Sequence, residues 1–334
     1  MKKYLLPQNG KFYKANLHCH TTVSDGAMTP EEVKAHYMRN GYSIVAYTDH
    51  EILIPHNELA DEKFLPLNGY EIQILQEGDE DIRLRKCCHI CLISIDPDNV
   101  KMVCHHRSKY VWGNARKYLN DIQYDEKAPD YERVYSNDGV NDVMKKGMDN
   151  GFFVTYNHPT WNQENYSDYM GYNYMHAMEI YNHASEVGGY PEYNEKEYDD
   201  MLRGNKHIFC IAADDNHTIK HCCGGFVMIK ADKLEYKTVM SALVAGDFYA
   251  SQEPLIHNLW FEDGKIHIDC SDAVTIRLNT ASRRAAIFRA EDGEVINSAD
   301  FDVVPEDGYV RITVVDSKGK CANTNAYFTN KLFK

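Results

Sequence analysis

Short apolar runs alternate with amphipathic stretches along the first 250 residues of the chain. Runs with the length and composition of strands cover residues 12–20, 43–48, 67–72, 87–95, 152–156, 177–181 and 207–213. Stretches with helical spacing and helix end signals cover residues 29–41, 140–151, 192–204 and 237–246. The clearest start is Thr29-Pro30-Glu31-Glu32, which combines a capping box with proline in the first turn. Strand followed by helix, repeated, predicts an α/β fold with a parallel sheet or barrel.

The pattern changes after about residue 254. Strand-like runs now follow one another at 259–269, 274–278, 285–290, 309–316 and 326–331, with Glu-Asp-Gly turns at 262–264 and 291–293. A length of 334 residues allows about two domains. We therefore expect an α/β domain over 1–253 and a small β-sandwich over 254–334. Residues 96–138 are polar and rich in tyrosine, and we treat them as an insertion in the first domain.

Composition and charge narrow the classes of function. Lys and Arg total 36 against 50 Asp and Glu, so the net charge is −14. This charge disfavours a long nucleic-acid footprint, although a small anion can still bind where local cations offset the field. The chain has no run of 18 apolar residues and no signal-peptide pattern, so we expect a cytoplasmic protein without a membrane span. Ten cysteines, several in apolar runs and two adjacent, indicate free thiols rather than disulfides.

Histidines and carboxylates recur at the ends of the predicted strands. His18-Cys19-His20 ends the first strand, where residues two apart point to the same face. Thr48-Asp49-His50-Glu51 follows the second strand, at the edge where α/β barrels place their active sites. The same placement recurs at Glu71, His89, Asn157-His158-Pro159, Glu179, Asn182-His183 and Asp214-Asp215-Asn216-His217.

Each of these residues also has an ordinary structural explanation. A single histidine on an apolar face is usually a core residue, and Asp49 could cap a following helix. Scattered histidines would not keep to strand ends so regularly, and the hypothesis of a metal centre depends on the whole set. Imidazole and carboxylate ligands together suit Zn²⁺, Mn²⁺ or Fe²⁺ better than Ca²⁺ or Mg²⁺. The motifs of serine hydrolases, P-loop proteins and dinucleotide-binding proteins are absent from the sequence.

Taken together, these motifs resemble the metal motifs of the PHP (polymerase and histidinol phosphatase) family in order and approximate spacing. The resemblance extends over about residues 12–250. It is carried by HCH at 18–20, SDG at 24–26, TDHE at 48–51, GYE at 69–71, His89, NHP at 157–159 and DNH at 215–217. The β-rich end is similar to the small C-terminal domain of some PHP phosphoesterases, through Tyr309-Val310-Arg311, Asp316 and Asn325.

The resemblance implies a distorted (βα)7 TIM-like barrel that holds up to three divalent metal ions. The first ion would take His18, His20, Glu71 and Asp215; the second would share Glu71 and add His89 and His158; the third would take Asp25, His50 and His217. Glu71, Asp215 and His217 would form the catalytic centre. Asp214 is an alternative to Asp215, and the Asp-x-His spacing to His217 favours Asp215.

This ligand set predicts hydrolysis of a small organic phosphate ester. Three divalent ions and three carboxylates leave a net local charge of about +3, which attracts a phosphate dianion. A hydroxide that bridges two ions would be a nucleophile near neutral pH. The alternatives are a nuclease or cyclic-nucleotide phosphodiesterase of the same family, and a non-catalytic, metal-loaded binding protein.

Three further residues are candidates for substrate contact: Arg107, Glu179 and His183. Arg107 follows His105 and His106 in a basic cluster and could bind phosphate, although a solvated loop explains it as well. Glu179 could instead orient a ligand imidazole. Trp161 could stack on a substrate ring or simply pack against the protein.

Overall fold

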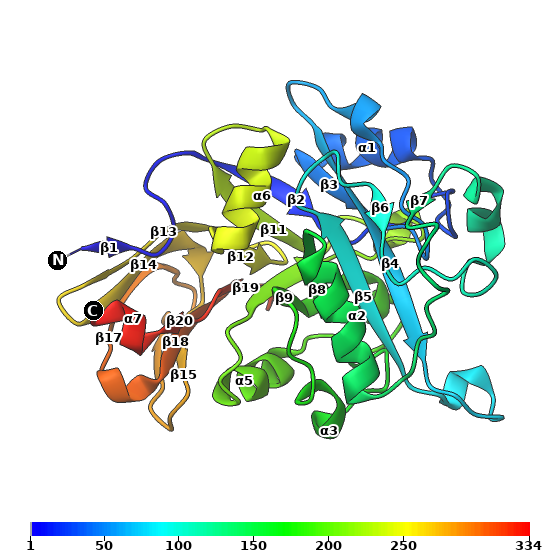
Figure 1. Cartoon of the computed structure of the whole chain (residues 1–334). Coiled ribbons are helices and arrows are strands. Elements are labelled where there is room, and N and C mark those ends of the chain that lie inside the picture. The colour runs from blue at the N-terminus through cyan, green and yellow to red at the C-terminus, as the bar shows by residue number, and fades with distance from the viewer. Residues whose placement is uncertain (1) are drawn as a thin grey trace.

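The computed structural model describes residues 2–334, in which a sheet of 14 strands runs through the molecule (Figure 1). One half of this sheet is built from β2 (Lys11–Asn16), β3 (Ile44–Tyr47), β4 (Leu65–Leu75), β5 (Cys87–Ser94), β8 (Phe152–Asn157), β9 (Ala177–Asn182) and β10 (Phe209–Ala213). The other half contains β11 (Phe226–Ala231), β12 (Phe248–Ser251), β15 (Thr275–Thr280), β16 (Ala286–Arg289), β18 (Tyr309–Val315), β19 (Cys321–Thr324) and β20 (Tyr327–Phe328). The strand order is β10-β9-β8-β5-β4-β3-β2-β11-β12-β19-β18-β15-β16, with β20 beside β18.

Strand β5 departs from the parallel sheet that the sequence predicts. Strands β2, β3 and β4 are parallel to one another, as are β8, β9 and β10. Strand β5 runs antiparallel to both of its neighbours, β4 and β8. Only residues 76–86 separate β4 from β5, and a connection of this length cannot carry the helical crossover that parallel neighbours need. The sheet is therefore mixed in direction.

The fold class is mixed α/β, as expected, but no continuous ladder closes the strands of residues 2–334 into a barrel. The chain does approach closure just beyond the ends of β2 and β10. There Cys19 forms a parallel bridge with Asn216, the amide of His20 donates to Asn216 O (3.2 Å) and the amide of Asp215 donates to His18 O (3.0 Å). The first and last strands of this half thus meet at the residues that carry the histidine motifs.

Helices cover the sheet on both sides. They are α1 (Pro30–Arg39), α2 (Asn137–Asp149), α3 (Tyr166–Tyr169), α4 (His183–Val187), α5 (Glu195–Arg203), α6 (Tyr236–Ala245) and α7 (Thr329–Leu332). The predicted capping box of α1 is confirmed: Thr29 Oγ1 accepts from the amide of Glu32, and Glu32 Oε2 accepts from the amide of Thr29. Helix α2 packs closely on the sheet because Gly147, which has no side chain, lies against Leu92 and Val154.

The C-terminal strands form two facing sheets with an apolar core between them. The second sheet has the order β1-β13-β14-β17, with β1 (Lys3–Tyr4), β13 (Ile256–Glu262), β14 (Lys265–Ala273) and β17 (Ile296–Asp302). Ile266, Phe301 and Ile312 are among the buried residues between the sheets. The amino-terminal strand β1 joins the second sheet by pairing with β13. In the large sheet β12 pairs with β19, so this sheet continues from the α/β part into the β-rich part. Figure 1 shows both chain ends on this side of the molecule.

The predicted insertion over residues 96–138 contains only short elements: β6 (Lys101–Met102), β7 (Gln123–Tyr124) and a 3-10 helix at Gly113–Tyr118. All ten cysteines are free thiols, as predicted. Cys88 packs in the apolar core, whereas Cys91 accepts a hydrogen bond from Asn157 on the other face of β5. Within residues 2–334, none of the helices combines the length and the apolar character that crossing a membrane requires.

Candidate metal centre

His18, His20, Glu71 and Asp215 converge on one point. Each offers a ligand atom, and these four atoms all lie within 4.8 Å of one another. The two histidines follow β2, and their Nε2 atoms are 3.1 Å apart, as expected for residues two apart in extended chain. Glu71 projects from the interior of β4 and Asp215 follows β10, so the point lies between β4 and the place where the ends of β2 and β10 meet.

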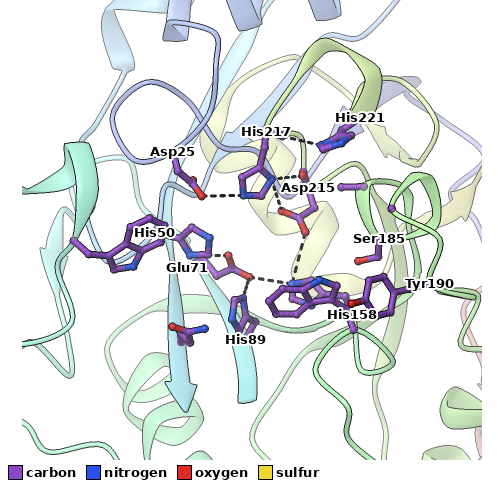
Figure 2. A pocket seen from close by; sticks show the side chains of 15 residues that line it. Asp25, His50, Glu71, His89, His158, Ser185, Tyr190, Asp215, His217 and His221 are labelled. Atoms are coloured by element: carbon purple, nitrogen blue, oxygen red, sulfur yellow. Dashed lines mark hydrogen bonds and ion pairs between the residues drawn. The ribbon is translucent and has the colours of Figure 1, made fainter. Parts of the chain in front are cut away.

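The carboxylate of Glu71 lies between several imidazoles (Figure 2). Its Oε1 is 3.2 Å from His18 Nε2, 3.1 Å from His89 Nδ1 and 3.4 Å from His158 Nε2. Its Oε2 is 3.1 Å from His50 Nδ1, and Glu71, His50 and His89 form a second compact group of ligand atoms. One carboxylate thus has each oxygen facing a different set of nitrogens, which is the arrangement of a residue that bridges two ions.

A third group combines His20, Asp25, His50 and His217. Asp25 Oδ2 is 3.3 Å from His217 Nε2, and the rings of His50 and His217 each lie 4.3 Å from the ring of His20. The turn that carries Asp25 requires Gly26, because a Cβ there would stand 2.5 Å from the carbonyl oxygen of His20. The glycine of the SDG motif therefore lets Asp25 approach the histidines.

Asp49 holds the turn that carries Asp25 through hydrogen bonds to the residues just before it. Its carboxylate accepts from the amide and hydroxyl of Thr21 (2.8 Å each) and from the amide and hydroxyl of Ser24 (3.1 and 2.7 Å). It is buried and does not line the cavity above the centre. Asp49 thus positions the loop before Asp25.

Glu179 orients two of the imidazole-bearing residues. Nδ1 of His18 donates to Glu179 Oε1 at 2.7 Å, which leaves Nε2 facing the centre. Glu179 Oε2 accepts from the amide of His158 (2.9 Å) and from Nδ2 of Asn182 (2.8 Å). Of the two roles considered for Glu179, these contacts match the orientation of a ligand imidazole. Asn157, named above only as part of the NHP motif, donates from Nδ2 to Glu71 Oε1 at 3.0 Å.

The adjacent carboxylates Asp214 and Asp215 have different surroundings. Asp214 accepts from the amides of Cys223, Gly224 and Gly225 at 2.6–2.9 Å and from the hydroxyl of Tyr37, which occupies its lone pairs. Only Asp215 belongs to the central group and lines the cavity. The Asp215 backbone has φ of 51°, and that of His158 has φ of 25°, both in the left-handed region that costs energy for such residues. Strain of this kind concentrates at functional sites.

Ionisation in the centre follows from charges that are buried together. Burial alone would raise the pKa of Glu71 and Asp215, but the surrounding imidazoles outweigh it and hold both values well below the usual range. Burial alone would lower the pKa of His18 and His20, and the carboxylates instead raise it well above the usual range. The protein thus keeps two ionised carboxylates in a buried place where only nearby positive charge can stabilise them.

The donor set fits a divalent metal ion. Glu71 Oε2 and Asp215 Oδ1 are buried and accept no hydrogen bond within residues 2–334, although imidazole nitrogens surround both oxygens. Buried oxygens without partners are costly, and an ion at their common focus would satisfy them. The mixture of imidazole and carboxylate suits Zn²⁺, Mn²⁺ or Fe²⁺.

A cavity of about 360 Å³ opens above the centre. Its walls include seven of the nine predicted ligand residues: Asp25, His50, Glu71, His89, His158, Asp215 and His217. Other parts of its wall come from Gln73, Trp112, Trp161, Ala184, Ser185, Gly188, Tyr190 and His221. Ser185, Tyr190 and His221 border the ligands in Figure 2.

None of the three predicted substrate contacts lines this cavity; Glu179 lies behind the ligands, and Arg107 and His183 have other partners. Arg107 is half exposed and donates to Asp130 Oδ1 (2.6 Å) and to the carbonyls of Glu126 and Ala128, so its guanidinium holds the 96–138 segment together. His183 begins α4, where its Nδ1 pairs with the hydroxyl of Tyr181 at 2.8 Å. Local partners thus explain both residues.

Sequence reasoning missed a buried ion pair beneath the centre. Arg133 donates Nη1 to Glu51 Oε1 (2.6 Å) and Nη2 to Glu51 Oε2 (2.7 Å), and both side chains are at most 4% exposed. Glu51 directly follows His50 and also accepts from the amide of Gln73 at 2.9 Å. The pair joins the TDHE motif to the 96–138 segment. The two residues are 82 positions apart, and no sequence signal links them.

Comparisons with solved structures give alignments of low identity with TM-scores below 0.5. Neither a protein-family model nor a curated protein matches the sequence. A two-domain protein from Bacteroides vulgatus, described as containing a predicted PHP-like metal-dependent phosphoesterase, aligns over 94% of both chains with 12% identity and a TM-score of 0.46. A provisionally assigned metal-dependent phosphoesterase from Bifidobacterium adolescentis aligns over 64% of this chain and 90% of its own (15% identity, TM-score 0.35). An amidohydrolase from Chromobacterium violaceum, with bound sulfate and no metal, aligns over 70% and 96% (12%, 0.39).

Proposed function

We propose that this chain is a metal-dependent phosphoesterase that hydrolyses a small organic phosphate. The observation that carries the proposal is the set of overlapping groups of imidazoles and carboxylates, which share Glu71 and His20 and open into one cavity. We further propose that the groups hold up to three ions of Zn²⁺, Mn²⁺ or Fe²⁺, and that the contacts between the ends of β2 and β10 complete a distorted (βα)7 barrel.

Divalent ions held there would lower the pKa of coordinated water and offset the charge of a phosphoryl group. The chain's own residues hold the ligand side chains in position around these ions. Glu71 and Asp215 stay ionised, Glu179 fixes the ring of His18, and the Nδ1–H of His217 donates to the carbonyl of Asp215 at 2.9 Å, which directs its Nε2 toward Asp25. A preorganised set of this kind binds charge without rearrangement during the reaction.

The size and charge of the cavity support a small substrate. About 360 Å³ is near the lower end for ligand pockets, and the net charge of −14 disfavours a polymer of phosphates. We therefore propose a phosphate ester of a small molecule, and not a long nucleic acid, as the substrate. The ten free thiols favour a reducing compartment, and we propose that the protein acts in the cytoplasm.

The proposal is tested by phosphate release from a panel of phosphomonoesters, cyclic phosphates and nucleotides. Wild-type protein is loaded with Mn²⁺ or Zn²⁺ and compared with Glu71→Gln, which keeps the shape and removes the central charge. The matched control is Glu164→Gln, because the carboxylate of Glu164 accepts from three tyrosine hydroxyls away from the cavity and belongs to none of the ligand groups. We expect release by wild type and control, and loss of both bound metal and release in Glu71→Gln.

Other outcomes identify the alternatives. Release only from cyclic phosphates or oligonucleotides, with steep salt dependence, would indicate a phosphodiesterase or nuclease. Bound metal without release from any ester would contradict the proposal and favour a metal-loaded binding protein. Equal release by Glu71→Gln would show that the chemistry lies elsewhere in the chain.

A further inference from the structure

Three large aromatic side chains stand at the mouth of the cavity, and none belongs to the ligand groups. Trp112 is 42% exposed, and its ring lies 5.5 Å from that of His50. Trp161 is 37% exposed, and its ring lies 5.2 Å from the rings of both His89 and His158. Tyr190 is 42% exposed and lines the same cavity. Aromatic area left open beside a cavity is typical of a ligand-binding surface.

The backbone holds these side chains in place. The buried carboxylate of Glu192 accepts from the amides of Thr160 (3.0 Å) and Trp161 (2.8 Å), which fixes the loop after β8. The amide of Tyr190 donates to Ser185 O at 3.0 Å. Close to Trp112, Ala115 is buried in a small apolar cluster with Val23 and Ile52, two residues near the metal motifs. The aromatic side chains are therefore carried on ordered backbone segments, which reduces what a planar ligand loses by ordering them.

The cavity wall, as described within residues 2–334, contains no lysine or arginine. Its carboxylates belong to the ligand groups, so ions held there would be the main positive charge in the cavity. One phosphate group would be matched by these ions, but a second phosphate further out would meet aromatic rings and no cation. The part of the substrate that faces outward is therefore not a second phosphate, and an uncharged group fits the aromatic wall.

We infer that the phosphate ester accepted here carries a planar, uncharged aromatic or heteroaromatic ring, which packs against Trp112 and Trp161. This inference rests on the proposed function and names its substrate class: a monophosphate ester of an aryl-bearing alcohol or a nucleoside. Trp112 and Trp161 are specificity-determining residues, and Tyr190 completes the wall on the side of α4.

The test compares benzyl phosphate with cyclohexylmethyl phosphate. Both esters release a primary alcohol and have rings of similar size, but only benzyl phosphate has a planar π-system. We expect kcat/KM of the metal-loaded wild type to favour benzyl phosphate by about tenfold, mainly through KM. Trp112→Ala and Trp161→Ala should each reduce this ratio to about threefold or less.

The control variant is Trp260→Ala, the third tryptophan of the chain, which stacks on His267 in the C-terminal sheet. It should leave the ratio unchanged. A wild-type ratio near one, or a ratio that neither Trp112→Ala nor Trp161→Ala lowers, would overturn the inference.

A binding measurement separates this inference from the proposed function. The non-hydrolysable benzyl phosphonate and cyclohexylmethyl phosphonate are titrated into metal-loaded protein by calorimetry. Preferential binding of benzyl phosphonate that is lost in Trp112→Ala supports the ring site even if no ester is hydrolysed, in which case only the proposed function fails. Equal affinity for both phosphonates overturns the ring site even if esters are hydrolysed.

Discussion

Removal of the Arg133 guanidinium should destabilise the whole protein, although the residue lies in an irregular segment. In Arg133→Met the carboxylate of Glu51 would stay buried with one remaining hydrogen bond, from the amide of Gln73. The variant would also lose donors to the carbonyls of Gln73 (2.9 Å) and Cys104 (3.3 Å) and the contact with the ring of Tyr110 at 4.1 Å. Breaking a buried ion pair by removing one partner costs about 3–5 kcal/mol.

This loss corresponds to a fall in Tm of roughly 6–20 °C. It is measured by thermal scans and by urea unfolding, in which the midpoint should fall while the slope stays the same. The matched control is Arg107→Met, because Arg107 pairs with Asp130 in the same segment but both side chains are more than a third exposed, so the change should stay within about 1 kcal/mol.

The double variant Glu51→Gln/Arg133→Met completes the argument. It also removes the charge of the Glu51 carboxylate, which has no cationic partner in Arg133→Met. We therefore expect the double variant to be more stable than Arg133→Met alone. The reasoning is refuted if Arg133→Met costs no more than Arg107→Met. It is also refuted if the double variant is no more stable than the single one.

Three further changes test other parts of the structure. Glu179→Gln should weaken Zn²⁺ or Mn²⁺ binding by about 10- to 100-fold in competition titrations, with no such loss in Glu192→Gln, because only Glu179 orients His18. Glu164 is buried below three tyrosine hydroxyls, and burial raises its pKa from 4.5 to about 7. The folded state therefore binds the extra proton, and wild-type stability relative to Glu164→Gln should fall by about 3 kcal/mol as the pH rises through this window; a flat difference in urea unfolding would contradict this. Asp214→Asn should lower stability by about 2 kcal/mol or more in thermal scans, since the amide nitrogen would face at least one backbone N–H group whichever carboxylate oxygen it replaces, whereas metal loss without this penalty is expected for Asp215→Asn.

Local patterns were sufficient for the elements whose signals lie within a few residues. The capping box at Thr29 and the strand before His18 are set by neighbouring residues, and the structure has both, although β2 ends at Asn16 and not at His20 as predicted. The convergence of His18, His20, Glu71 and Asp215 could also be predicted, because parallel strands bring their carboxyl ends to one edge. The resemblance to a known family added the grouping of these residues.

Features that depend on distant contacts could not be predicted. The direction of β5 is decided by a connection whose shape has no clear sequence signal. The partners of Arg107 and Arg133 could not be predicted, because an arginine in a polar segment can contact a substrate, a carboxylate or water. Strands β17 and β19 were missed because both contain polar residues such as Asn297 and Asn323, and β19 has only four residues. Their place in the sheet depends on pairing with distant strands.

The pairing of β1 with β13 has a consequence for how the chain is made. Lys3 and Tyr4 lie opposite Phe261 and Trp260, and Leu6 is buried in the C-terminal apolar core. At about 5–20 residues per second, a ribosome needs roughly 13–50 s to advance from the first of these strands to the second. Residues 3–6 therefore emerge long before their partners exist, and the C-terminal core is assembled from segments that lie far apart in the sequence. A fusion partner that prevents residues 2–6 from pairing with β13 would delay folding of the C-terminal core. The histidine motifs would then come together before that core has formed.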